Sequence, residues 1–101
     1  MAITTEYRQQ NEVLVIKTGE KFDFSKVEDF RSAYGSVNPD TRHIAVDLSN
    51  TEYMDSSALG MLLNMQKSLK QNNYTYSIEN ARPQVAKILQ ISRFDKKFEL
   101  R

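Results

Sequence analysis

Three neighbouring polar residues, Asp55, Ser56 and Ser57, carry the groups in this chain that are best suited to chemistry. They follow an apolar stretch and precede apolar residues at helical spacing, which run from Ala58 to Lys70. Aspartate and serine are favoured at helix N-termini, because their oxygens accept hydrogen bonds from the free amides of the first turn. A hydroxyl there lies near the positive end of the helix dipole, where negative charge is stabilised. The motif predicts a helix cap and also suits a phosphate group.

The composition excludes several other kinds of site. The chain has no cysteine, so disulfides, thiolate catalysis and thiolate metal ligands are excluded. His43 is the single histidine, which excludes a multi-histidine metal site and leaves Ser56 without a nearby imidazole base. Asp23 and Asp55 alone are a thin ligand set for a divalent cation. We therefore expect no catalytic residues, no metal and no cofactor, and a protein that is not an enzyme.

Length and charge indicate a single small domain that spans residues 1–101. The 14 basic and 13 acidic residues give a net charge of +1 and are spread along the chain, so we expect no direct contact with nucleic acid. No apolar run is long enough to cross a membrane, and the N-terminus lacks the pattern of a signal peptide. We expect a cytoplasmic protein that does not insert into a membrane.

The hydrophobic pattern predicts strands that alternate with helices. Strand-like segments are 3–9, 13–18, 43–48, 74–78 and a short one at 98–100. Helices are predicted from a capping box at Ser25 and Glu28, from the Asp55 motif to Lys70, and over 83–91. The resulting order, β-β-α-β-α-β-α-β, predicts an α/β fold whose mixed, mostly parallel sheet is flanked by helices.

Functional sites of such sheets lie beyond the carboxyl ends of the strands, and two predicted loops lie there, Glu20–Phe24 and Tyr53–Ser57. Of Phe22 and Phe24, we expect one ring in the core and the other at a contact surface. A larger set of apolar side chains is expected in the core: Met54, Leu59, Met61, Leu62, Leu63, Met65 and Leu69. Asp47 is either a structural acid or a group that orients the Ser56 loop, and the sequence does not separate the two.

Four stretches together resemble a known family. They are Gly19-Glu20 with Asp23, the strand 44–48 with Asp47, the motif Met54-Asp-Ser-Ser-Ala-Leu-Gly60, and the helix 83–91 followed by Phe94. Over essentially its whole length the chain resembles the STAS family, named for sulfate transporters and anti-sigma factor antagonists. Its single-domain members suggest an anti-sigma factor antagonist, and the chain is most similar to biofilm regulators of the SypA type from marine γ-proteobacteria.

The resemblance implies a switch between partners. In such members a serine kinase of the anti-sigma type phosphorylates the serine directly after the motif's aspartate, and a PP2C-type phosphatase removes the phosphate. In the SypA type, both activities belong to one response regulator. Only the unmodified form binds its partner. Carried over, the phosphoacceptor is Ser56, and the partner-binding residues are Asp23, Phe24, Met54, Asp55 and Ser57.

An alternative of another class stays open. The chain would then be an accessory STAS subunit of a lipid-transport ABC complex that docks permanently on an ATPase and is never phosphorylated. The Asp55 motif would be an interface only. A domain that binds a small ligand is a further possibility, although nothing in the sequence specifies the ligand.

Overall fold

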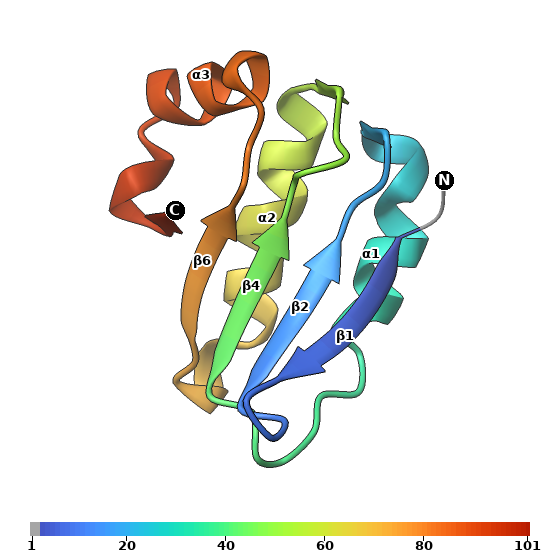
Figure 1. The fold of residues 1–101 in the computed structure, drawn as a ribbon, viewed down its shortest axis with the longest axis vertical. Helices are drawn as coiled ribbons and strands as arrows, with labels where there is room; N and C mark the ends of the chain where they lie inside the picture. Colours follow the sequence, from blue (N-terminus) through green and yellow to red (C-terminus); the bar gives the residue numbers. More distant parts are fainter. Residues whose placement is uncertain (1–2) are drawn as a thin grey trace.

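The computed structural model describes residues 3–101 and is built around a five-stranded sheet with the order β1-β2-β4-β6-β7 (Figure 1). These strands are β1 (Thr4–Arg8), β2 (Val13–Lys17), β4 (His43–Asp47), β6 (Thr75–Glu79) and β7 (Glu99–Leu100). β1 pairs antiparallel with β2, and the other neighbours pair in parallel. The predicted mixed, mostly parallel sheet is confirmed, with β4 at its centre.

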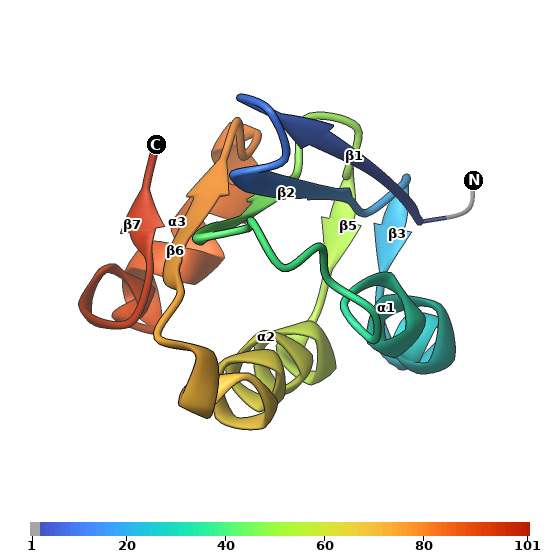
Figure 2. The same ribbon diagram turned by 90° about the horizontal axis from the view of Figure 1, so that it is seen from below.

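Three α-helices connect the strands: α1 (Val27–Ala33), α2 (Ser56–Ser68) and α3 (Pro83–Ile91). Seen along the sheet, α1 and α2 lie side by side on the same side of it (Figure 2). α3 lies near the carboxyl end of β6 (Figure 1). No helix among residues 3–101 is both long enough and apolar enough to cross a membrane.

The core lies between the sheet and the helices. Alternate strand residues face it, because side chains of a strand point to opposite sides in turn. Ile44, Val46 and Ile78 are fully buried there against Leu62 and Met65 of α2. Val15, between the core residues of β2, is also fully buried, so β2 is covered on both faces as its continuous apolar run predicted.

Local structure differs from the prediction at three places. The first helix begins with a short 3-10 helix, η1 (Phe24–Lys26), whose cap is Asp23 and not Ser25. Asp23 stands two residues earlier, and its carboxylate accepts hydrogen bonds from both the amide and the hydroxyl of Ser25. Leu63, predicted in the core, is 40% exposed because it turns away from the buried side of α2. Two short strands, described next, were not predicted.

Candidate functional site at two aspartate-capped loops

The two loops at the carboxyl ends of β2 and β4 are joined by a two-stranded parallel ribbon, β3 (Lys21–Phe22) with β5 (Tyr53–Met54) (Figure 2). In its register Phe22 stands opposite Met54, and both side chains are buried, with 0% and 3% exposed. Lys21 and Tyr53 stand opposite each other and are exposed. The loops that follow β3 and β5 therefore start side by side, at equivalent positions of the two paired strands.

An aspartate follows each short strand and caps the helix behind it. Asp23 caps η1 and Asp55 caps α2, both in an extended backbone conformation. Each carboxylate accepts from the amide two residues later, Ser25 or Ser57, at 3.0 Å, and from the hydroxyl of the same serine. An aspartate cap of this kind satisfies amides that the first helical turn leaves free. The two loops thus share one local structure.

The two serines of the motif differ in exposure and in hydrogen bonding. Ser57 is half-buried, and its hydroxyl donates to Asp55. Ser56 is the first residue of α2, its side chain is exposed, and it makes no side-chain hydrogen bond among residues 3–101. The hydroxyl that is free to react is therefore that of Ser56.

The electrostatics of the cap favour negative charge. The hydrogen bond from the Ser57 hydroxyl, helped by backbone amides of Ser57 and Ala58, lowers the pKa of Asp55 below its ordinary value of 3.8. Hydrogen bonds to the ionised form and the positive end of a helix both stabilise a carboxylate. Asp55 is thus ionised at neutral pH beside the Ser56 hydroxyl.

Buried threonines hold the two loops together. The Thr51 hydroxyl donates to the carbonyl of Gly19 at 2.6 Å and also lies 2.6 Å from the Thr18 hydroxyl. The carbonyl of Glu20 accepts from the amides of Glu52 and Tyr53. The sequence reasoning missed Thr18 and Thr51, because only the pairing of distant loops makes their hydroxyls important. They are positioning residues for the site.

The exposed surface of the site is partly aromatic. Phe24, which takes the same place after Asp23 that Ser56 takes after Asp55, is 69% exposed, whereas Phe22 is buried. This confirms that one of the two rings lies in the core, and the role of Phe24 as a contact residue stays a prediction. Tyr53 is 50% exposed and was not predicted at the surface. Met54 was predicted both as a partner contact and as a core residue, and its burial corrects the first: its side chain belongs to the core.

Other residues considered from the sequence lie apart from the caps. The buried Asp47 accepts from the amide of Ser49 at 2.8 Å and lies 4.0 Å from Arg8, and these contacts are compatible with both roles considered for it. His43 bonds the hydroxyls of Thr75 and Ser77 on the neighbouring strand. Burial, with a contribution from Arg101, lowers its pKa. Among residues 3–101 no group of three or more histidine, cysteine or acidic side chains is arranged to hold a metal.

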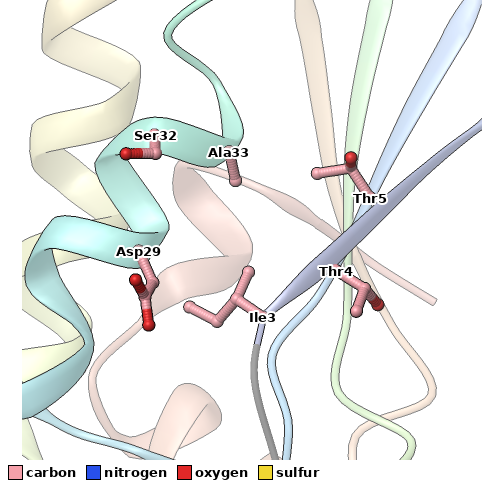
Figure 3. A pocket seen from close by; sticks show the side chains of 6 residues that line it. All are labelled: Ile3, Thr4, Thr5, Asp29, Ser32 and Ala33. Atoms are coloured by element: carbon pink, nitrogen blue, oxygen red, sulfur yellow. The ribbon is translucent and has the colours of Figure 1, made fainter.

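A hollow of about 460 Å³ also opens between β1 and α1 (Figure 3). Ile3, directly before β1, reaches toward α1, where Asp29 and Ala33 face it (Figure 3). The rest of the lining of the hollow consists of short side chains with hydroxyl groups. These groups do not converge on one point where a ligand would bind. We assign no function to it.

The comparisons with known proteins concern the whole chain. The model of the STAS domain family matches residues 4–101. The chain belongs to the STAS family. It is 42% identical over 100 residues to a STAS-domain containing protein of Pseudomonas aeruginosa, covering 99% of both chains. It is 28% identical over 93 residues to the anti-sigma-B factor antagonist of Staphylococcus aureus, covering 91% of this chain and 86% of that one.

Solved structures show the same STAS fold. The anti-sigma factor antagonist SpoIIAA in its unphosphorylated form matches with a TM-score of 0.78 at 23% identity, covering 99% of this chain and 88% of that one. The phosphorylated form of SpoIIAA from Bacillus matches with a TM-score of 0.70, covering 99% of this chain and 91% of that one, at the same identity. At this level of identity the likeness concerns the fold.

Proposed function

We propose that this STAS protein is a partner-switching regulator of the anti-sigma factor antagonist type, controlled by reversible phosphorylation of Ser56. In its unmodified form it binds a serine kinase of the anti-sigma type. A PP2C-type phosphatase reverses the modification, and in the SypA-type regulators that the chain resembles the two activities belong to one response regulator. The protein acts in the cytoplasm by binding and not as an enzyme. Its output is transcription or biofilm formation, as in the SypA-type regulators it resembles.

The observation that supports this proposal best is the unequal state of the two serines. A kinase needs a hydroxyl that reaches out from the surface, and Ser56 offers one at the first position of α2. Ser57 is held by Asp55. The names of the relatives, anti-sigma factor antagonists among them, agree with this role.

Electrostatics explain how one phosphate can switch binding while the fold is kept. A phosphate adds about −1.5 to −2 charges at pH 7. At the N-terminus of α2 the helix dipole stabilises this charge. A partner that docks on this face meets the phosphate together with the ionised Asp55. The two negative groups repel an acidic group of the partner. We expect little change in the far-ultraviolet circular dichroism spectrum or melting temperature on phosphorylation.

The docking face combines the charged caps with exposed aromatic rings. Asp23, Asp55 and Ser57 give it polar groups, and Phe24 gives it an apolar anchor. Tyr53 extends the apolar part from the exposed side of β5. Exposed aromatic side chains at the centre of an interface often contribute most of its binding energy. Met54 supports this face from the core.

The test is co-expression with candidate serine kinases of the anti-sigma type, followed by intact-mass measurement and mapping of the modified peptide. We expect one phosphate on Ser56 in the unaltered protein, none in Ser56→Ala, and one in Ser25→Ala, whose serine occupies the matching cap. A phosphate that persists in Ser56→Ala contradicts the assignment. Absence of phosphate with any cognate kinase, together with stable co-purification of an ATPase, supports the accessory-subunit alternative.

Binding measurements test the switch itself. Ser56→Ala should bind the kinase as the unmodified protein does, while Ser56→Asp should bind at least about tenfold more weakly, since close charge repulsion costs more than about 1.4 kcal/mol. Phe24→Ala should also weaken binding by about tenfold. Ile91→Ala, which removes an equally exposed apolar side chain from α3, is the control and should bind normally. Equal affinity of all four variants excludes the proposed face.

A further inference from the structure

A second surface feature lies on the C-terminal half of α2. A hollow of about 460 Å³ is lined there by Leu63, Gln66 and Lys67 of α2. Lys70, the first residue of the 3-10 helix η2 (Lys70–Asn72), and Lys97, which directly follows the last 3-10 helix, η3 (Phe94–Lys96), complete the lining. The Gln66 side chain donates to the carbonyl of Lys97 at 2.6 Å, which ties its two walls together. The hollow is a shallow, open groove whose two walls are joined by this hydrogen bond.

The charge of this groove is unbalanced. None of its three lysines forms an ion pair with any residue in the range 3–101. No aspartate or glutamate stands between Asp55 and Glu79 in the sequence, so α2 and the turn after it bring no acid to the groove. The nearest acid of the last 3-10 helix, Asp95, pairs with Arg93 at 3.3 Å. The net charge of the chain is only +1, so three unpaired lysines in one groove are a local excess of positive charge. This excess is complementary to an acidic ligand.

The groove also holds an apolar contact. Leu63 is 40% exposed although it lies on a helix whose other apolar side chains are largely buried. A concave site that places one leucine among lysines fits a segment that projects an apolar side chain flanked by carboxylates.

This surface is separate from the phosphorylation site. Lys67 lies about three turns, or roughly 16 Å, beyond Ser56 along α2. Exposed charges farther apart than about one Debye length, ~8 Å at physiological salt, are largely screened from each other. A partner in the groove can therefore stay bound whichever state Ser56 is in.

We propose that the groove between α2 and the last 3-10 helix is a second docking surface, which binds an acidic protein segment with an apolar anchor independently of the state of Ser56. The protein then joins two partners, one that is switched at the caps and one that is held at the groove.

The test is a nuclear magnetic resonance titration of the isotope-labelled full chain. The probe is a short synthetic peptide with glutamates on both sides of one leucine. We expect amide shifts confined to residues 63–70 and 94–98, and loss of binding at about 1 M salt, where the Debye length is about 3 Å. Exchanging the peptide's leucine for serine should weaken binding about fivefold.

Three double variants complete the test, and two of them, at Lys67/Lys97 and at Arg42/Lys87, change the net charge by the same amount. Lys67→Glu/Lys97→Glu should weaken peptide binding by at least about tenfold, and Lys67→Gln/Lys97→Gln by less. Arg42→Glu/Lys87→Glu makes the same change of net charge elsewhere and should bind normally. Ser56→Asp should also bind normally, which separates this surface from the caps. The absence of groove shifts, an equal loss in the Arg42/Lys87 control, or sedimentation with phosphatidylglycerol vesicles without peptide binding overturns the proposal.

Discussion

The loop after β3 and the loop after β5 have the same aspartate cap but expose different side chains. Each has a buried apolar residue, an aspartate, an exposed residue and a serine bound to that aspartate. The exposed residue is Phe24 in one loop and Ser56 in the other. Phe24 begins the three-residue 3-10 helix η1, which leads directly into the seven-residue α1, whereas Ser56 begins the 13-residue α2.

This difference teaches where a modifiable hydroxyl belongs. Only a long helix presents a full set of aligned peptide dipoles, and such a helix end stabilises a phosphate. The first turn behind Phe24 is a 3-10 turn, whose hydrogen-bond geometry is poorer than that of an α-helix, and the seven-residue α1 that follows it is shorter than α2. This loop carries an aromatic ring instead of an exposed serine. One loop is therefore suited to receive charge and the other to supply apolar contact. Four predictions test this comparison, in order of expected effect.

The largest effect is expected at the buried residues that anchor the loops. Phe22→Ala should lower the free energy of unfolding by about 3–5 kcal/mol, because the ring is fully buried and lies 5.1 Å from the ring of Phe30. Phe24→Ala, two residues away and exposed, should stay within about 0.5 kcal/mol of the unaltered protein. Urea denaturation measures both, and similar losses would show that both rings stabilise the fold.

The link between the loops comes next. Thr51→Val keeps the shape of the side chain but leaves the Gly19 carbonyl and the buried Thr18 hydroxyl without this partner. An unsatisfied buried polar group costs about 1–3 kcal/mol, which urea denaturation detects. Thr5→Val, on the exposed strand β1, is the control and should change stability little. Equal stability of the two variants would show that the loops are held by other contacts.

The caps themselves should differ in strength. Asp55→Ala should cost about 1 kcal/mol, the usual effect of removing a good N-cap. Asp23→Ala should cost less, because it caps the 3-10 turn η1 in front of the seven-residue α1 and not the first turn of the 13-residue α2. Chemical denaturation of both variants at neutral pH compares them. If Asp23→Ala is the more destabilising, the assignment of the stronger cap to α2 is wrong.

The smallest effect is a dependence on pH. Because the pKa of Asp55 is lowered on folding, the unfolded chain binds this proton more readily than the folded chain. The carboxylate therefore stabilises the fold above the ordinary pKa of 3.8, and this stabilisation is lost as the pH falls through the lower folded pKa. Asp55→Asn keeps a cap without titrating. The stability difference between the two proteins should shrink on acidification, and a constant difference would contradict this.

The sequence was sufficient for the main elements because their signals are local. Continuous apolar runs marked β2 and β4, and Pro83 marked the first residue of α3. It was insufficient at Ser25, where the capping-box pattern competed with an aspartate two residues earlier. It was also insufficient for β3 and β5, since a strand of two residues has no periodicity and exists only through its partner.

The sequence by itself determined the α/β order, the family resemblance and the Asp55-Ser56-Ser57 motif, because residue type and spacing along the chain carry these features. Only the tertiary structure decided which serine is free and that Met54 is buried while Phe24 is exposed. It also decided that Thr51 joins the two loops and that Lys67 of α2 and Lys97, which follows η3, share one groove. Burial and hydrogen bonding between distant segments are set by how the elements meet in space, which local sequence does not specify.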